Sequence, residues 1–374
     1  GIGDFYYSPP SGFLALCSSN LPDTTISPNQ STQADDHFIT TTYSGDSNNS
    51  TQISTGFQPD WVWIKNRTEG SSDGSGEHML YDSSRGVHDD LNSNNSSAED
   101  TNTNGLQEFG STFFRPGSLT RTNETGDTYV AWNWKANGGT TSSNTDGSKT
   151  STVQANTTAG FSIVLYSGDS SSFTVGHGLN SAPEWVIVKS RTHSERWAVF
   201  HTSISNQYIY LNENFAGSTG NADERFGNST SVVVPNSTVV TLGANNSDVS
   251  KNGENYVMYC FHSVEGYSKF GSYVGNGSTD GTYIHLGFRA SWFMTKRTDT
   301  SNNWLIWDNT RNPNNMATQY LLADVSNSEY SDGAVDFLAN GIKARASGTG
   351  LNASGGTYIY MAFAEQPFKF SNAR

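Results

Sequence analysis

Short runs of alternating apolar and polar residues recur along the whole chain. In the run WVWIKNR, Trp61, Trp63 and Lys65 fall on one face of an extended chain, and the residues between them fall on the other. β-Branched and aromatic residues dominate such runs, and clusters of Gly, Asn, Asp and Ser bound them. Helical periodicity is scarce, and only the segment ATQYLLADVSNSEY (317–330) suggests a short helix or turn. The pattern therefore predicts an all-β protein.

Four landmarks occur three times in the same order. The first is a Tyr-x-Gly turn, and the second, 18 or 19 residues later, is a Trp followed four positions on by Lys. The third is a short aromatic strand (HMLYDS, RWAVFHT, NWLIWDN), and the fourth is a Tyr-led strand such as TYVAWNW. Landmarks in register three times predict three copies of one module. The first two landmarks stand at Tyr43, Tyr166 and Tyr273, and at Trp61/Lys65, Trp185/Lys189 and Trp292/Lys296.

A module of about 100 residues made only of strands must cover its apolar faces by packing two sheets together. We therefore expect three tandem antiparallel β-sandwiches of the jelly-roll or lectin-like type, at 36–139, 158–268 and 269–374. An N-terminal strand and linker occupy 1–35. The segment 140–157 has few apolar residues, which predicts an extended or flexible linker. The second and third modules join directly and should pack rigidly.

Composition and charge narrow the classes of function. The net charge is −14 with only 21 Lys+Arg, which argues against nucleic acid because binding it requires clustered cations. No apolar run is long enough to predict a membrane-spanning helix. Abundant aromatic residues suit thin cores in a chain with 34% hydrophobic residues. Cys17 and Cys260 lie in apolar strand patterns, where a free thiol packs as a small hydrophobe, and a disulfide between them stays open.

Residues with catalytic or metal-binding chemistry are scattered. None of the eight His belongs to a metal-spaced pair, no nucleophile elbow surrounds a Ser, and the pair Asp89/Asp90 has no recurrent partner. We therefore expect no enzyme, no catalytic residue, no metal and no cofactor. Structural calcium stays open as an alternative, because the Gly-rich loops 70–78 and 275–281 offer oxygen ligands without EF-hand spacing.

Two further possibilities involve carbohydrate. Exposed tryptophans on a sandwich can stack on sugar rings, although large aromatics in alternating strands are usually core residues. Thirteen N-x-S/T sequons occur, and one precedes each Tyr-led strand, where Asn also suits a turn. The tryptophans considered for sugar stacking are Trp61, Trp63, Trp132, Trp134, Trp304 and Trp307. The candidate glycosylation sites are Asn66, Asn123, Asn156, Asn228, Asn236, Asn276 and Asn352.

Several long segments of the sequence resemble segments of a known family. NTTAGFSIVLYSG, VGHGLNSAPEWVIVKSR, VEGYSKFGSYVGNGSTDG, WLIWDNTRNP and YMAFAEQPF resemble repeat modules of tail-fibre-like or virion-surface structural proteins of tailed phages. The resemblance extends from about Asp4 to Arg374. The opening stretch GDFYYSPPSGFLALCSSNLPD resembles instead the final strand of a SPRY-like sandwich that precedes such modules in longer relatives. The resemblance implies a structural protein located outside the cell or on a virion surface.

An apolar strand without its own sandwich must be covered by something. Three coverings are open: the strand packs on its own first module, hangs loose, or adds to a β-sheet of a neighbouring copy. Strand addition would make a head-to-tail contact, which builds a filament when it does not close. We therefore expect a fibre subunit whose partner is itself; the alternative is a receptor- or glycan-binding module of a phage tail fibre or capsid surface. The proposed assembly strand contains Phe5, Tyr7, Phe13, Leu14 and Leu16.

Overall fold

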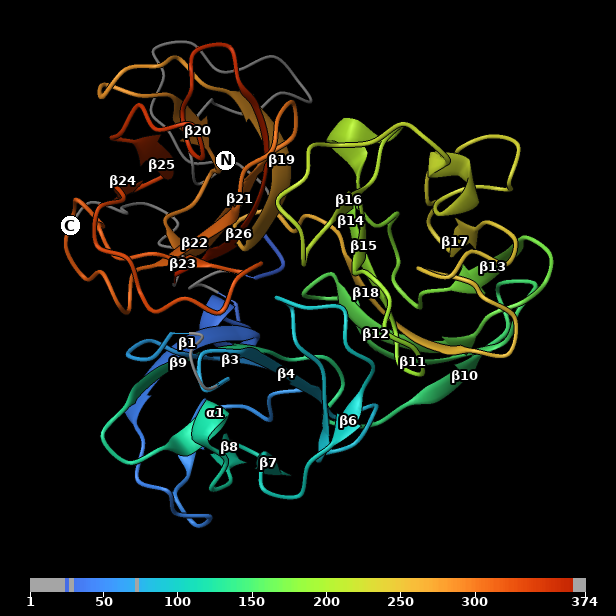
Figure 1. Ribbon diagram of the computed structural model, residues 1–374, viewed down its shortest axis with the longest axis horizontal. Helices are drawn as coiled ribbons and strands as arrows, with labels where there is room; N and C mark the ends of the chain where they lie inside the picture. The colour runs from blue at the N-terminus through green and yellow to red at the C-terminus, as the bar shows by residue number, and fades with distance from the viewer. Residues whose placement is uncertain (1–23, 27–29, 71–73, 366–374) are drawn as a thin grey trace, which may run out of the picture.

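The computed structural model describes residues 24–26, 30–70 and 74–365. Nearly every element in these residues is a strand, and every paired strand is antiparallel, so the all-β prediction is confirmed (Figure 1). The one α-helix in the described part is the single turn α1 (Thr120–Asn123). The segment 317–330 forms turns and the short strand β23 (Leu321–Leu322) instead of a helix. No helix in the described ranges has the length and hydropathy needed to cross a membrane.

The first module packs a four-stranded sheet, with order β1-β9-β3-β4, against a three-stranded sheet with order β2-β8-β7. The core between them takes Val62 and Ile64 from the large sheet and Leu106 and Phe114 from the small one. The strands are β1 (Phe38–Ser44), β2 (Ile53–Ser54), β3 (Trp61–Asn66), β4 (His78–Asp82), β7 (Leu106–Phe109), β8 (Phe113–Pro116) and β9 (Thr128–Trp134), beside the short pair β5 (Asp89–Asp90) and β6 (Asp100–Thr101).

The second module has a seven-stranded sheet, with order β10-β11-β12-β18-β14-β15-β16, and a small pair, β13-β17. Residues 140–157 are therefore not a free linker, because they form the edge strands β10 and β11 of this sheet. The elements are β10 (Ser142–Asn144), β11 (Ser151–Asn156), β12 (Phe161–Ser167), β13 (Phe173–Gly176), β14 (Trp185–Ser190), β15 (Ala198–His201), β16 (Ile209–Tyr210), β17 (Val239–Leu242) and β18 (Asn255–Phe261), with the 3-10 turns η3 (Thr202–Ile204) and η4 (Ala222–Glu224).

The third module has a five-stranded sheet, with order β19-β26-β21-β22-β23, and a small sheet with order β20-β25-β24. Its strands are β19 (Ser268–Val274), β20 (Tyr283–His285), β21 (Ala290–Arg297), β22 (Trp304–Asp308), β24 (Val335–Leu338), β25 (Gly341–Ala344) and β26 (Thr357–Ala364). The same four-strand order, β1-β9-β3-β4, recurs as β12-β18-β14-β15 and as β19-β26-β21-β22. The four sequence landmarks thus occupy equivalent places in three modules.

The repeated tyrosine of each Tyr-led strand anchors the loop that precedes it. Tyr129 Oη donates to the carbonyl of Thr120 at 2.6 Å and accepts the amide of Glu124 at 2.8 Å. Tyr256 makes the same pair of bonds nine and five residues upstream, as does Tyr358. Because a buried hydroxyl must find partners, each tyrosine fixes the loop's backbone while its ring packs in the module core. This role explains why the tyrosine is present in all three copies.

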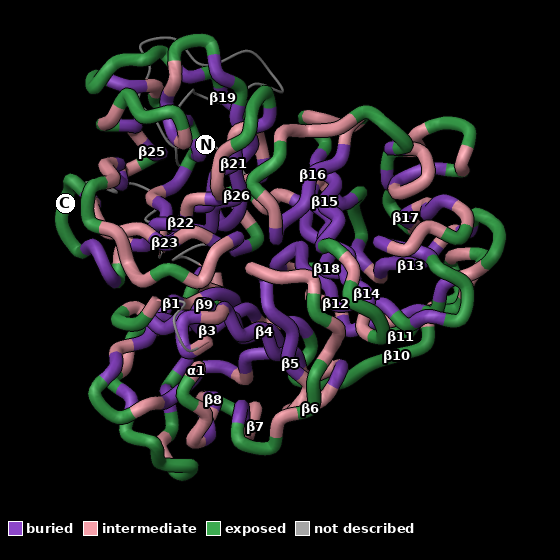
Figure 2. The backbone as a smooth tube through the Cα atoms, in the orientation of Figure 1, coloured by how far each residue is buried: buried purple, intermediate pink, exposed green. Residues whose placement is uncertain are grey.

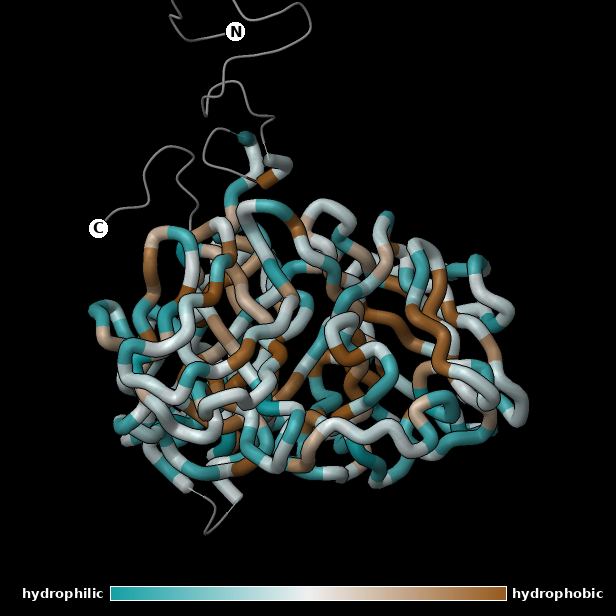
Figure 3. The backbone as a smooth tube through the Cα atoms, turned by 90° about the horizontal axis from the view of Figure 1, so that it is seen from above, coloured by the Kyte–Doolittle hydropathy of each residue, from teal (hydrophilic) through white to brown (hydrophobic). Residues whose placement is uncertain are grey.

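The three modules meet around one centre (Figure 1), and the inner faces of their large sheets form a single apolar core. The Phe363 ring lies 5.7 Å from that of Trp134 and 6.1 Å from that of Phe261, so all three modules contribute to one aromatic cluster. Buried residues gather where the sheets meet (Figure 2), while hydrophilic loops lie toward the outside (Figure 3). The first module is therefore packed against the other two and is not flexibly tethered to them.

The shared core predicts that the chain unfolds as one cooperative unit. Trp292→Ala removes a fully buried ring from this core and should cost about 3–5 kcal/mol. Differential scanning calorimetry should show one transition, which the substitution moves to lower temperature without splitting it. Val234→Ala, at a position 50% exposed, is the control and should leave the midpoint almost unchanged. Three separable transitions in the unsubstituted protein would contradict the shared core.

Candidate functional site

Each module meets the next through an equivalent hydrogen bond, made by the first residue of the aromatic strand or the residue just before it. Trp197 Nε1 in the second module donates to the carbonyl of Asn92 in the first at 2.8 Å. Trp304 Nε1 in the third module donates to the carbonyl of Tyr210 in the second at 2.9 Å. His78 Nε2 in the first module lies 2.9 Å from the carbonyl oxygen of Leu322 in the third. The three heterologous contacts thus close a ring within one chain.

The junction between the first and second modules also contains buried ions. Glu99 accepts hydrogen bonds from Arg85 of its own module at 3.0 Å and from Arg191 of the next module at 2.7 Å. Arg85 in turn is paired with Asp82, whose Oδ2 also accepts from Tyr259 Oη of the second module at 2.7 Å. A bridging carboxylate between two guanidinium groups is a strong, geometrically specific contact. It fixes how these two modules sit against each other.

The junction between the third and first modules repeats this arrangement. Glu329 accepts from Arg311 of its own module and from Arg67 of the first module, each at 2.8 Å. Asp308 pairs with Arg311 and accepts from Trp132 Nε1 of the first module at 3.1 Å. Burial raises the pKa of Glu329, but the bonds from Arg67 and Arg311 outweigh burial and hold that pKa below its usual value. The carboxylate therefore stays charged at neutral pH.

The junction between the second and third modules is built from backbone groups. The amide of Asn302 donates to the carbonyl of Asn214, and the amide of Gly217 donates to the carbonyl of Thr298, both at 2.8 Å. The position that Asp82 and Asp308 hold in the other modules is occupied here by His201, which is opposite Trp185 in the sheet. The three junctions therefore share their geometry but not their charges.

The lysine of each Trp-x-x-x-Lys strand is fully buried at a junction. Lys189 Nζ donates to the carbonyl of the following residue at 2.8 Å and approaches the carbonyl of Ser96 in the first module at 3.3 Å. Lys296 does the same in its own module and with Asn214 of the second. Burial lowers the pKa of Lys65 to about 7, with Arg311 adding to the effect, and lowers the pKa of Lys189 and Lys296 to about 8.

The sequence identified these lysines as landmarks of the repeat but did not predict that they are buried at the junctions. A lysine in a β-strand is normally exposed to solvent. The signal was nevertheless present, because Lys65 shares its face with Trp61 and Trp63, and that face is the shared core. The cost of burying the ammonium group is met by carbonyl oxygens at the module boundary. The packing of the modules at this position therefore depends on whether the lysine is protonated.

The other predicted site residues divide into two groups. The assembly strand (Phe5, Tyr7, Phe13, Leu14, Leu16) and Cys17 lie outside the described residues, and Cys260 is a free, buried thiol. The six tryptophans considered for sugar stacking are core residues, because none of them is more than 1% exposed. For calcium, loop 275–281 and the described part of loop 70–78 belong to no group of three or more acidic, His or Cys side chains.

Three of the proposed glycosylation sites are buried. Asn66 Nδ2 donates to Asp127 Oδ2 at 2.7 Å, and Asn123 Nδ2 donates to Asp46 Oδ1 at 3.0 Å. Asn352 Nδ2 donates to Asn276 Oδ1 at 2.8 Å. A glycan would be attached at that nitrogen, so the folded structure has no room for one at these three positions. Asn156 is partly buried, and its amide lies against His37 and Lys135. Asn228, Asn236 and Asn276 are exposed.

The modules also differ at one edge of their large sheets. In the second module, β11 pairs with β12, the outer strand of the repeated four-strand set, from Thr152↔Leu165 to Asn156↔Phe161. The equivalent strands in the other modules pair on one side alone within the described ranges, β1 with β9 and β19 with β26. The edge of β19 is partly covered, because its Phe270 amide donates to Ser263 Oγ. The edge of β1 is thus the most open of the three.

These features define a class of protein: three repeated sandwich modules that close into a ring around one core. The chain belongs to the family described as Domain of unknown function (DUF7483), which matches residues 33–367. The match extends across all three modules. A comparison with curated proteins found no match.

The buried lysines predict stability that increases with pH. Their pKa values in the folded chain, about 7 to 8, lie below the value of 10.5 expected when unfolded, so the folded chain binds fewer protons within this window. The free energy of unfolding should therefore rise from pH 7 toward pH 10, by on the order of 3 kcal/mol for each lysine. Urea titrations should show a smaller rise for Lys189→Met and an unchanged rise for the exposed control Lys251→Met.

Measurements should end near pH 10, because burial raises the pKa of core tyrosines such as Tyr129. Above that pH the unfolded tyrosines lose protons before the folded ones do, and stability should fall again. A flat profile between pH 7 and pH 10 would mean that the lysines stay charged when buried.

Glycans, if the host adds them, are expected at exposed sequons alone. After expression in a glycosylating host, peptide mapping by mass spectrometry should find glycans within the set Asn228, Asn236 and Asn276 and none at Asn66, Asn123 or Asn352. The buried amides of the second set are already bonded inside the fold. A folded protein carrying a glycan on Asn123 would contradict the structure, and an unmodified peptide mass would remove glycosylation altogether.

Proposed function

We propose that this protein is a non-enzymatic structural subunit, located outside the cell or on a virion surface, whose copies assemble head-to-tail into a fibre by donating the N-terminal strand. The observation that carries the proposal is the pairing of β11 with β12. It supports the proposal, because in the second module the edge of the repeated four-strand set pairs with a further strand of the same chain. The equivalent edge of the first module, β1, has no such partner among the described residues.

The open edge of β1 is suited to strand addition. The amide of Lys135 donates to the carbonyl of His37, and the amide of Gly45 donates to the carbonyl of Asp127, so odd-numbered residues of this segment direct their backbone groups toward β9. The even-numbered residues therefore direct theirs away from β9. The carbonyl of Thr40 accepts a long hydrogen bond of 3.4 Å from Thr310, and no hydrogen bond from the described residues reaches the backbone of Thr42. An unpaired edge of this kind invites another chain.

The donor would be the segment with Phe5, Tyr7, Phe13, Leu14 and Leu16. Each backbone hydrogen bond of an added strand contributes roughly 0.5–1.5 kcal/mol. Burying each of Phe13, Leu14 and Leu16 contributes roughly 1.5–3 kcal/mol. Together these terms exceed the lower part of the association cost of about 4–15 kcal/mol. These magnitudes support strand donation as the contact that holds a polymer.

The arrangement of titratable groups supports a structural role over catalysis. Lys65, Lys189 and His78 have strongly shifted pKa values, and His201 has its pKa lowered by burial to about 3. Perturbed groups often mark active sites, but structural networks perturb them as well. Here all four lie at module junctions, and the hydrogen bonds of Lys65, Lys189 and the His78 Nε2 atom go to backbone carbonyls. These groups therefore serve to stabilise the contacts between the modules.

The donor and the acceptor can be tested separately. Deleting residues 1–19 should leave folded monomers, measured by light scattering and by electron microscopy, whereas the full chain forms fibres. Thr42→Pro should block the acceptor, because it removes an outward amide while sparing the ladder to β9. Ser18→Ala with Ser19→Ala is the control and should leave assembly unchanged.

Mixing the two assembly-deficient proteins sharpens the test. A chain with an intact donor and a blocked acceptor should form a dimer with a chain that has the opposite defects. Fibres from the truncated chain, or a full chain that stays monomeric at high concentration, would overturn strand donation.

A further inference from the structure

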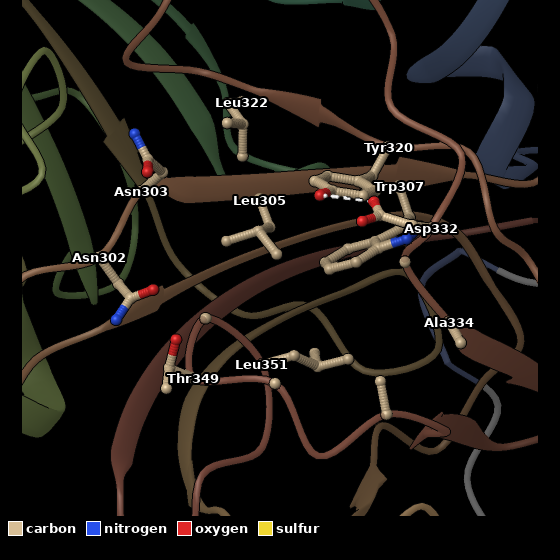
Figure 4. A pocket seen from close by; sticks show the side chains of 14 residues that line it. Asn302, Asn303, Leu305, Trp307, Tyr320, Leu322, Asp332, Ala334, Thr349 and Leu351 are labelled. Carbon is tan, nitrogen blue, oxygen red and sulfur yellow. Dashed lines mark hydrogen bonds between the residues drawn. The ribbon is translucent and has the colours of Figure 1, made fainter.

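The third module has a pocket on a face that its two counterparts bury. The pocket has a volume of about 280 Å³ and lies between strands β22 and β23 on one side and the loops that flank β24 and β25 on the other (Figure 4). Its apolar lining includes Leu305, Leu322 and Leu351, and its polar lining includes Asn302, Asp332 and Thr349. Leu305 and Trp307 lie on the face of β22 opposite to Trp304 and Ile306, so the pocket lies on the side of the strand that faces the small sheet of its own module.

The equivalent positions in the other modules are covered. In β4 and β15 the outward residues are Met79 with Tyr81 and Ala198 with Phe200, and all four are fully buried. In β22 the corresponding residues are Leu305 and Trp307, of which Leu305 is partly exposed. On the next strand Leu322 is partly exposed as well. The first two modules therefore cover this face with their own residues, and the third leaves part of it open.

Glycines keep the pocket open. A Cβ added at Gly350 would lie 3.1 Å from Leu305 Cδ1 and 3.2 Å from Asn302 Oδ1, which is closer than ordinary packing allows. At Gly333 an added Cβ would lie 2.5 Å from the Tyr320 ring. Side chains at these two positions would fill the space. The loop segment SGTG therefore preserves a cavity that any larger residue at position 350 would narrow.

The polar groups around the pocket are held in place but not saturated. Tyr320 Oη donates to Asp332 Oδ1 at 3.0 Å, and the Tyr320 ring is stacked on Tyr330 at 5.1 Å between centroids. The second carboxylate oxygen of Asp332 and the side-chain amide of Asn302 make no hydrogen bond within the described residues. The buried Trp307 Nε1 also has no partner there. The unpaired oxygen of Asp332 and the side-chain amide of Asn302 are available to a ligand.

The chemistry of the lining restricts the ligand. An exposed carboxylate, no cationic side chain in the lining and a net charge of −14 disfavour anionic ligands. The apolar surface of Leu305 and Leu322 matches the C–H face of a sugar ring, whose hydroxyl groups can reach Asp332 and Asn302. The volume lies near the lower limit for ligand sites, which fits one ring. We propose that this pocket binds a single neutral sugar residue at the end of a glycan, an activity that goes beyond assembly.

The test uses the full chain and the methyl glycosides of glucose, galactose, mannose and N-acetylglucosamine. Saturation-transfer NMR and calorimetry should find at least one of them bound saturably with a dissociation constant in the millimolar range. Asp332→Ala removes the acceptor, and Gly350→Val fills the pocket. Each should weaken binding by roughly tenfold or more, because one removes a hydrogen bond and the other removes space.

Two matched controls lie outside the pocket. Asp280→Ala removes an exposed carboxylate that does not line the pocket, and Gly220→Val, in the second module, places its Cβ no nearer than 3.7 Å to another residue. Both should bind as the unsubstituted chain does, and thermal unfolding should confirm that all four variants are folded. The proposal is overturned if none of the four glycosides binds saturably, or if binding is the same in Asp332→Ala and Gly350→Val as in the controls.

Discussion

The contact between the inner faces of the three large sheets is the constraint on which the rest of the structure depends. Each large sheet is apolar on both faces, one covered by the small sheet of its own module and the other by the neighbouring modules. A module alone would expose its inner face, including Trp61, Trp185 or Trp292, to water. Closing the ring buries all three inner faces at once. Removing any one module would expose the inner faces of the other two to water.

The junctions follow from that closure. Bringing three repeats together places the same strand, and hence the same lysine, at each boundary. The chain then supplies carbonyl oxygens to each ammonium group, and at two boundaries adds a carboxylate between two guanidinium groups, Glu99 or Glu329. Repeats within one chain can diverge one by one, unlike the identical subunits of a symmetric trimer. The third boundary has diverged in this way, since backbone hydrogen bonds replace the ion pairs.

Closure also leaves two kinds of surface with separate uses. The sheet edges carry backbone groups that favour strand addition, and β11 already occupies one of them. The outer faces are covered by each module's small sheet, except where the glycines of the third module leave a pocket beside Leu305. An assembly contact at the edge of β1 and a ligand on the outside of the third module would not compete. The two proposals thus place assembly and ligand binding on different elements of the ring.

The sequence by itself determined the strands, their threefold repetition and the buried state of the tryptophans, because alternation and landmark spacing are local properties of a chain. It did not determine the ring, since an inner face that is apolar can be covered by a sheet, a neighbouring module or another chain. The strand β11 was not predicted because STVQAN has too few apolar residues to indicate burial, and pairing with β10 and β12 makes it a strand. The burial of Lys65 was not predicted either, because residues of the other modules close its face. Such burial is decided by residues hundreds of positions away, which only the tertiary structure brings together.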